Sequence, residues 1–522
     1  MTKEEWKLIG ARYFHQGYAA AVGSLNSSFH TPRDTEGHGS HTLSTAGGNF
    51  VEGASVFGFG NGTAKGGSPK ARVAAYKVCW PPVGGNECFD ADILAAFDIA
   101  IHDGHGIVVV CSAGNSGPAD GTVSNISPWQ FTVGASTMDR QFPSYVVLGN
   151  KKRLEVSFPP DLKIGLKESL VVANIEGQSA WQYFDMEEVF HLKPCHPTSS
   201  FHLSVLQMPK QLMHQLMTRK DRTTQAIGEG KDLGVPSRGE CKGGQGPASC
   251  SGWCCGDGSC HNELTGNEVI ADPHVLPASH INFTDGVAVF TYLNSTKSPI
   301  AYITPSTTEL GTKPAPFMAA FSSKGPNTIT PEILKPDITA PGGTSMSCPH
   351  VSGIVGLLKT LHPDWSPAAI RSAMMTTART MDNSMEAILN ASYFKATPFS
   401  YGAGHVRPNR AMNPGLVYDL NVNDYLNFLC ALVPKLHGSI TVTRTLKNVG
   451  LPETYKARIR KPTGISVSVK PDSLKFIRSG EKTFSLTLQA ERAGAARDYV
   501  FGELIWSDAK HFVRSPIVVK AA

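Results

Sequence analysis

The sequence predicts an α/β fold, with a largely parallel sheet and flanking helices, followed by a small β-sandwich. Residues 7–142 alternate short apolar runs with segments of helical periodicity, which is typical of α/β units. After about Ser439, apolar residues alternate or cluster at strand lengths between Pro and Gly turns. The chain has 522 residues, of which 41% are hydrophobic. At roughly 150 residues per domain, this length indicates two to four domains.

In the first part of the chain, a strand is predicted over Ala71–Val78 and a helix over Asp90–Asp103. The helix ends at Gly104, a residue suited to the position after a helix. A buried strand follows over Ile107–Cys111, and the turn residues Ser112–Pro118 come directly after it. In open α/β sheets, functional sites form at that carboxyl edge. The predicted apolar face of the helix consists of Ile93, Phe97, Ala100 and Ile101.

The periodicity is lost between about Glu176 and Asn267, and this stretch is not assigned a fold. It returns in the second part, where apolar residues of Val351–Leu358 repeat at i, i+3, i+4 and i+7 and predict an amphipathic helix. A further helix is predicted over Ala368–Ala378, because Ser366-Pro367 is a typical N-cap followed by proline at the first helical position. The boundary to the sandwich is expected near Val433-Pro434.

The composition excludes several classes of function. Charged residues make up only 17% of the chain, the net charge is +5, and no long Lys/Arg run occurs, so a nucleic-acid-binding role is not expected. The chain has no apolar run of membrane-spanning length. The residues Met1–Trp6 lack the apolar region of a signal peptide, so no signal peptide is expected in this chain.

The cysteines and the glycosylation motifs give a partial indication of the compartment. The chain has 11 Cys, an odd number, of which five lie in Cys241–Cys260. The others are scattered, which fits buried small hydrophobic residues or an occasional disulfide better than a disulfide scaffold. N-x-[ST] motifs, which are glycosylated only in secreted proteins, favour secretion. They begin at Asn26, Asn61, Asn125, Asn282, Asn294 and Asn390.

Three residues in distant motifs could form a hydrolytic site. His38, in Gly37–His41, offers an imidazole that titrates near neutrality among small neighbours; the alternative is a helix cap or a metal ligand. Ser345 precedes the predicted amphipathic helix, where backbone N–H groups favour developing negative charge; the alternative is an ordinary N-cap. Asn115 could donate its amide to an oxyanion after the buried strand; the alternative is a turn asparagine.

The sequence around these residues resembles that of the subtilisin-like serine proteases, specifically the plant subtilases. The resemblance implies a serine-type endopeptidase that acts on proteins or peptides through an acyl-enzyme, with His38 as general base, Ser345 as nucleophile and Asn115 as oxyanion donor. It implies no cofactor, no nucleic-acid or membrane partner, and secretion to the cell wall or apoplast. The matching segments are Lys7–Arg12, Arg33–Thr42, Ala71–Trp80, Ser112–Pro118, Phe321–Gly342, Gly343–Gly353 and Tyr401–Leu420.

The same resemblance implies the domain organisation. Residues 1–165 and 313–432 are expected to form a discontinuous protease domain with a subtilisin-like parallel sheet. Residues 166–312 are expected to be the remnant of a protease-associated insert, poorly ordered in its Cys-rich part. Residues 436–522 are expected to form a fibronectin-III-like sandwich.

The chain departs from the family pattern at three places. The stretch before His38 has the acidic residues Glu4, Glu5, Asp34 and Glu36, none of them in the context of the triad Asp, so no triad Asp is identified. Asp34 is interpreted as a cap on the helix that carries His38. The segments 100–107 and 340–344 are shorter than in the family, so a substrate-pairing strand and the residues before Ser345 are missing.

The Cys-rich stretch has a metal-binding alternative. Cys241, Cys250, Cys254, Cys255, Cys260 and His261 could hold zinc, but their spacing does not match paired C-x2-C ligands, so no metal site is predicted. We interpret Glu176–Asn267 as non-native coding sequence, from a retained intron or a faulty gene prediction, because it has neither periodicity nor family resemblance.

Two main hypotheses about function follow. The first is a secreted endopeptidase, and the second is a catalytically impaired or dead family member that acts at most as a protein-binding module. A third, a metal-binding or disulfide-rich signalling protein built around Cys241–Cys260, is weaker. Substrate specificity, disulfide pairing and oligomeric state are not predicted by the sequence.

Overall fold

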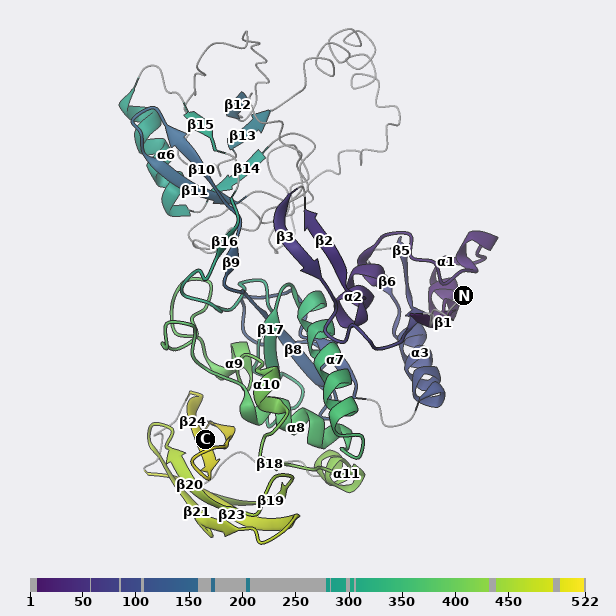
Figure 1. Cartoon of the computed structure of the whole chain (residues 1–522), viewed down its shortest axis with the longest axis vertical. Helices are drawn as coiled ribbons and strands as arrows, with labels where there is room; N and C mark the ends of the chain where they lie inside the picture. Colours follow the sequence, from purple (N-terminus) through teal and green to yellow (C-terminus); the bar gives the residue numbers. More distant parts are fainter. Residues whose placement is uncertain are drawn as a thin grey trace. The chain divides into compact units, whose positions relative to one another are not determined.

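The chain divides into two compact units, drawn in Figure 1. The computed structural model describes residues 7–56, 58–83, 86–104, 108–157, 170–173, 203–206, 278–281, 283–296, 301–304, 307–430, 438–491 and 498–520. The first unit comprises Met1–Glu52, Thr63–Met138 and Lys313–Ala522, and the second comprises Gly53–Gly62 and Asp139–Thr312.

Parallel strands form two small sheets in the first unit. In one sheet β1 (Leu8–Tyr13) pairs with β4 (Val73–Lys77), and in the other the order is β17 (Ile338–Pro341), β8 (Phe131–Ser136), β7 (Val110–Ser112). The predicted parallel α/β character is confirmed. Among the described residues, these parallel strands lie in two sheets.

The helix predicted before β7 is confirmed as α3 (Asp90–Asp103), but part of its predicted packing face is wrong. The buried residues of α3 are Asp92 and Ala96, whereas Ile101 is 49% exposed. Asp92 faces inward because its carboxylate accepts hydrogen bonds of 2.9 Å from the backbone N–H groups of Gly17 and Tyr18, at the start of α1 (Gln16–Val22). Gly104 follows the helix in an extended conformation, with φ −160°.

The helix after β17 covers the three-stranded sheet, and the helix that follows it packs into the same main core. The predicted amphipathic helix is α7 (Thr344–Leu361), which buries Val351, Ile354 and Leu358 against residues of β8 and β17. The next helix is α8 (Pro367–Thr377), and Ser366 caps it as predicted, its hydroxyl accepting the Ala369 N–H at 3.0 Å. This core positions the start of α7 at the carboxyl end of β17.

The helix α2 (His38–Gly47) packs against α7 through glycines. A Cβ added at Gly353 of α7 would lie 2.6 Å from the Cα of Gly67 and 2.7 Å from the carbonyl oxygen of Ala46. The hydroxyl of Ser68 also donates to the Gly353 carbonyl at 2.6 Å. Only a residue without a side chain allows this close approach.

The C-terminal β-sandwich is confirmed. Its two antiparallel sheets have the orders β18-β19-β23-β21 and β22-β20-β24-β25, and Trp506, Tyr455 and Phe484 are buried between them. The first strand, β18 (Leu416–Val417), lies before the predicted start of the domain because it pairs with β19 (Ser439–Asn448). The other strands are β20 (Thr454–Arg460), β21 (Ile465–Lys470), β22 (Ser473–Lys475), β23 (Gly480–Ala490), β24 (Val500–Ser507) and β25 (Phe512–Val519).

The second unit contains an antiparallel sheet and the helix α6 (Phe283–Ser295). The strand order is β12-β13-β14-β11-β10-β15. Residues 139–157, which the sequence places in the protease domain, group with this unit because β10 and β11 pair with β15 and β14. The strands are β10 (Pro143–Leu148), β11 (Arg153–Ser157), β12 (Leu170–Ala173), β13 (Leu203–Leu206), β14 (Ala278–Ile281) and β15 (Ala301–Ile303).

The remaining described elements are short. They are the helices η1 (Ser27–Phe29), α9 (Pro398–Tyr401), α10 (Pro408–Ala411) and α11 (Val422–Cys430), and the strand pairs β2 (Val51–Val56) with β3 (Phe59–Ala64), β5 (Cys79–Val83) with β6 (Asn86–Cys88), and β9 (Arg140–Gln141) with β16 (Glu309–Leu310). Among the described residues, no helix is long and apolar enough to cross a membrane. Apart from β13, the stretch Glu176–Asn267 lies outside the described residues, and so does the expectation that it is poorly ordered.

The described cysteines include both kinds that the sequence predicts, an occasional disulfide and a buried free thiol. Cys79 and Cys88 form a disulfide across the hairpin of β5 and β6. Cys111 and Cys348 are free, and burial raises the pKa of Cys111 to about 11 and that of Cys348 to about 12. Both are therefore protonated thiols near neutral pH, without the thiolate that reactive cysteines need.

Candidate active site

Ser345 is the second residue of α7, directly after the turn that follows β17. Gly342 in this turn has φ +97°, a conformation that favours glycine. The hydroxyl of the fully buried Ser347 donates to the Ala340 carbonyl at 2.7 Å and so fixes the first turn of the helix to the strand. Ser345 itself is half-buried, at a helix N-terminus whose free N–H groups favour negative charge.

Asn115 lies on the turn after β7, and the structure brings it to the start of α7. The Thr344 hydroxyl donates to the Asn115 side-chain oxygen over 2.5 Å. Among the described residues, no hydrogen bond of the Asn115 amide N–H2 group is seen, so this group can act as a donor. The Asn115 side chain is exposed, so a substrate can reach it. The predicted oxyanion donor and the residue before the predicted nucleophile are therefore in direct contact.

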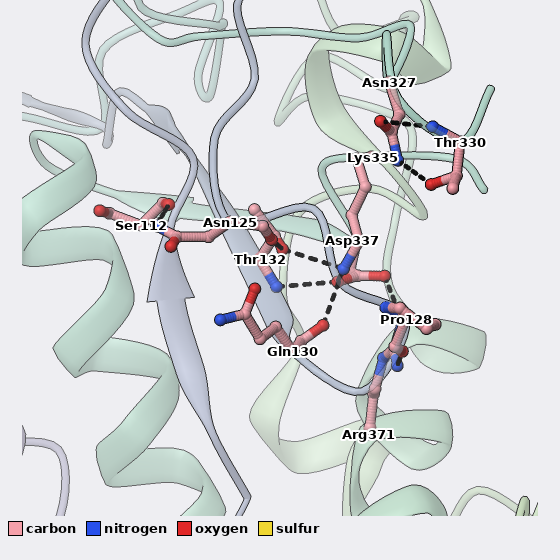
Figure 2. A network of polar contacts seen from close by, with 10 residues as sticks. All are labelled: Ser112, Asn125, Pro128, Gln130, Thr132, Asn327, Thr330, Lys335, Asp337 and Arg371. Atoms are coloured by element: carbon pink, nitrogen blue, oxygen red, sulfur yellow. Dashed lines mark hydrogen bonds and ion pairs between the residues drawn. The ribbon is translucent and has the colours of Figure 1, made fainter. Parts of the chain in front are cut away.

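A chain of hydrogen bonds connects this turn to the core, as Figure 2 shows. The Asn125 amide donates to the Ser112 carbonyl at 2.8 Å, and the Thr132 hydroxyl donates to the Asn125 carbonyl at 2.5 Å. Thr132 in turn accepts a hydrogen bond of 2.9 Å from the Lys335 ammonium. These hydrogen bonds thus connect the end of β7, three residues before Asn115, to the buried Lys335.

At the base of this chain lies a buried ion-pair network that the sequence analysis missed (Figure 2). The Asp337 carboxylate is 2.7 Å from the Lys335 ammonium and 2.5 Å from the Arg371 guanidinium, and the Lys335 and Asp337 side chains are 0% and 1% exposed. Burial alone would raise the pKa of Asp337, but the Arg371 and Lys335 cations hold it below its ordinary value. The signal was available in Lys335-Pro336-Asp337, two charges at the entrance to an apolar strand.

His38 is the first residue of α2, and Gly37 before it has φ +106°. The His38 side chain is exposed. Within the part of the chain that the structure describes, no hydrogen bond connects the His38 imidazole to Ser345 or to a carboxylate. Catalytic hydrogen bonds are often long without substrate, so the pairing of His38 with Ser345 stays a prediction.

Asp34 caps the helix that carries His38. One carboxylate oxygen accepts the N–H groups of Glu36 at 3.1 Å and Gly37 at 2.9 Å, and the other accepts the N–H and the hydroxyl of Ser40, both at 2.7 Å. The hydrogen bond from Gly37 and those from Ser40 hold the pKa of Asp34 well below its ordinary value. Both oxygens are thus engaged at the helix start, as expected of a capping residue.

The packing of α2 on α7 relates His38 to Ser345. The contact point is between Ala46 and Gly353, and His38 and Ser345 each lie eight residues before it on their helices. At 1.5 Å per residue, each is about 12 Å along its helix from the contact. His38 and Ser345 are therefore equally far along their own helices from the contact between α2 and α7.

The structure describes several of the other predicted positions. Asn26 and Asn61 are exposed, the Asn125 amide is used in the hydrogen bond to Ser112, and the Asn390 side-chain oxygen accepts the Ser392 and Phe394 N–H groups. Asn294 lies on α6, and Asn282 lies outside the described residues. Among the described residues, no three His, Cys, Asp or Glu side chains are grouped to hold a metal; Cys241–Cys260 is not among them.

Comparisons with known proteins agree with the fold and the motifs. A family model described as "Subtilase family" matches residues 14–404, and one described as "Fibronectin type-III domain" matches residues 424–519. Subtilisin-like protease SBT5.3 of Arabidopsis thaliana is 48% identical over 98% of this chain and 75% of that protein. Subtilisin-like protease SBT5.4 of the same plant is 47% identical over 98% of this chain and 74% of that protein.

The alignment with SBT5.3 extends over 614 residues, more than the 522 of this chain, so this relative has residues in the aligned region that the chain lacks. Among solved structures, the subtilisin-like protease Apa1 from Pseudoalteromonas sp. AS-11 covers 78% of this chain and 92% of its own, with 13% identity and a TM-score of 0.31, too loose to add to the argument. From the family model and the plant relatives, the chain belongs to the subtilase family of subtilisin-like serine proteases.

Proposed function

We propose that this chain cleaves proteins or peptides as a serine endopeptidase, with His38, Ser345 and Asn115 as its catalytic residues. The contact between Thr344 and Asn115 carries the proposal, because it sets an amide donor against the start of the helix that presents Ser345. His38 would take the Ser345 proton as the hydroxyl attacks the carbonyl carbon of the substrate. The negative oxygen that forms would accept a hydrogen bond from Asn115. Proton return from His38 to the leaving amine, and then water attack on the acyl-enzyme, would complete the reaction.

We expect the chain to be a weak hydrolase, because among the described residues no carboxylate contacts the exposed His38 to fix its tautomer or to stabilise the imidazolium. In serine proteases, subtilisin included, loss of the triad Asp costs roughly four orders of magnitude in kcat. The cap geometry of Asp34 supports this expectation, since both of its oxygens accept hydrogen bonds from the helix start. Asp34→Asn should therefore leave the residual rate of proteolysis almost unchanged. A large loss would instead assign Asp34 to the triad.

The alternative is an inactive family member that only binds proteins. A fluorophosphonate probe separates the two, because it reacts only with an activated serine. We expect slow labelling of the full chain that Ser345→Ala abolishes and Asn115→Ala slows by about 100-fold. Ser347→Ala is a poor control because Ser347 anchors α7, whereas the exposed Ser116 has no side-chain hydrogen bond among the described residues, so Ser116→Ala should label like the parent. Absence of labelling at Ser345 in a folded chain would favour the alternative.

We propose further that the protein acts outside the cell. The exposed Asn26 and Asn61 support this, since glycosylation of N-x-[ST] motifs occurs in secreted chains. Expression in plant cells behind an added signal peptide should give a chain whose mass falls on treatment with a glycan-removing amidase. An unchanged mass would show that these motifs are not glycosylated and would remove this support for secretion. Sequencing the transcript over Glu176–Asn267 tests whether that stretch is translated, and spliced in-frame mRNA would overturn our interpretation of it.

A further inference from the structure

We infer that Ser323 is a positioning residue for Asn115, an inference that rests on the proposed function of Asn115 as oxyanion donor. Ser323 is bonded to both neighbours of Asn115 in the chain. Its backbone N–H donates to the Gly114 carbonyl at 2.9 Å, and its hydroxyl accepts the Ser116 N–H at 2.8 Å. One residue therefore fixes the backbone on either side of the catalytic amide.

The fit around Ser323 leaves the turn little freedom. Ser323 is 0% exposed, and Gly114, with φ +97°, comes so close that an added Cβ would lie 3.0 Å from the Ser323 hydroxyl. A Cβ at Gly117 would lie 2.3 Å from the Ala320 carbonyl oxygen, and the Gly117 N–H donates to the Phe321 carbonyl at 2.9 Å. The segment 320–323 thus forms the wall against which the turn is held.

Asn115 depends on this wall because its own side chain is exposed and unsupported by core packing. Thr344 fixes the position of the amide oxygen, and Ser323 fixes the backbone from which the side chain projects. Together these two constraints decide where the amide N–H points. A donor must be held within about 0.5 Å of its productive position, and a misplacement of about 1 Å costs up to 100-fold in rate.

The adjacent Ser322 provides a matched control. It is also buried, 5% exposed, and its hydroxyl also accepts one backbone N–H, that of Ala135 at 2.9 Å. Ala135 belongs to β8, so the Ser322 hydroxyl supports the sheet and makes no hydrogen bond to the turn. Ser322→Ala and Ser323→Ala remove the same chemical group from neighbouring buried positions, and each leaves one backbone N–H without an acceptor.

The first measurement is amide hydrogen exchange in the parent chain, which needs no variant. Ser116 is exposed, yet its N–H is bonded to a buried hydroxyl, so we expect it to exchange at least 100-fold more slowly than a free amide. Ser323→Ala should speed exchange within residues 114–117, and Ser322→Ala should speed it within β8. A fast Ser116 amide in the parent, or equal exchange of 114–117 in both variants, would overturn the inference.

The second measurement is the rate of Ser345 labelling by the fluorophosphonate probe in the full chain. We expect Ser323→Ala to label roughly 10- to 100-fold more slowly than the parent, and Ser322→Ala within about threefold of it. In a parent with measurable turnover, the loss should lie in kcat with KM unchanged, because the oxyanion forms after substrate binding. Equal labelling rates in the two variants would overturn the inference. An unlabelled parent would overturn the proposed function instead, and the exchange data would still decide whether Ser323 holds the turn.

Discussion

The helices α2 and α7 both begin directly after a glycine and both present a predicted catalytic residue, yet their starts are supported very differently. The start of α7 follows the buried strand β17 after a short turn, and its first turn contains the buried residues Thr344 and Ser347. The start of α2 lies at the surface, where Gly47, at its far end, is the only buried residue of the helix, and Asp34 supplies the capping hydrogen bonds.

The two halves of the site are therefore not equally preorganised. The half with Ser345 and Asn115 rests on the sheet core and on the Asp337 ion-pair network, whereas the half with His38 rests on a surface cap and one helix contact. Residues locked by packing hold a catalytic geometry better than residues at a solvent-exposed helix end. Changes in the core should therefore affect the first half strongly, and changes at the surface should affect only the second.

The largest expected effect is that of Asp337→Asn. It leaves the Lys335 and Arg371 charges buried without a counter-charge, which costs about 3–5 kcal/mol of unfolding free energy. Urea unfolding of the full chain measures the loss. Asp120→Asn is the control, because Asp120 is exposed and its ion pair with the half-buried Lys324 should contribute less than about 1 kcal/mol. Equal losses in the two variants would show that the network does not support the core.

Acid should weaken the half with Ser345 before it affects the cap of α2, because His405 pairs with Thr339 of β17, the strand that leads to α7. Burial, and then the charge of Arg379, lower the pKa of His405 to about 4 from an ordinary value of 6.5. Between these values the unfolded chain binds a proton that the folded chain does not, so stability falls as the pH drops from 6.5 towards 4, by up to about 3 kcal/mol. Asp34 stays ionised over this range because its pKa lies well below its ordinary value.

The measurement for His405 is the pH dependence of the urea midpoint. His405→Gln should be less stable than the parent at pH 7, but its stability should depend less on pH between 6.5 and 4. Parallel pH curves for the parent and His405→Gln would contradict the assignment, since another group would then bind the proton.

Gly353→Ala should separate the two halves. The added methyl group would lie 2.6 Å from Gly67 and 2.7 Å from the Ala46 carbonyl, so α2 must move away from α7, at a cost of about 1–3 kcal/mol. We expect labelling of Ser345 to fall sharply because His38 moves with α2. Gly356→Ala serves as a milder control, since its closest contact is the Ser68 hydroxyl, at 2.9 Å. Unchanged labelling in Gly353→Ala would mean that His38 does not activate Ser345.

The smallest expected effect is that of Asp34→Asn on stability. It weakens the hydrogen bonds at the start of α2, which is exposed, so the loss should be about 1 kcal/mol or less. Hydrogen exchange should become faster in residues 38–47 and stay unchanged in α7. Faster exchange in both helices would show that the two starts are coupled more tightly than their supports indicate.

Much of the fold was predictable because it is encoded locally. Ser366-Pro367 marked the start of α8, the apolar spacing of Val351–Leu358 marked α7, and strand-length alternation marked the sandwich. For α3 the bounds were correct, but Asp92 was not expected inside. The buried partners of an acidic side chain come from another segment, here the N–H groups at Gly17 and Tyr18, and periodicity carries no information about them.

The local patterns of the sequence were enough to predict the main helices, the sandwich, the family motifs and the candidates His38, Ser345 and Asn115. How these candidates are supported became visible only in the folded chain. The Thr344 bond to Asn115, the Ser323 bonds around it and the Asp337 network each join residues that are far apart in the chain or depend on burial. Short-range patterns fix backbone conformation, because propensities and caps act within a few residues. Hydrogen bonds between distant segments depend on how whole elements pack, and packing is a property of the folded chain.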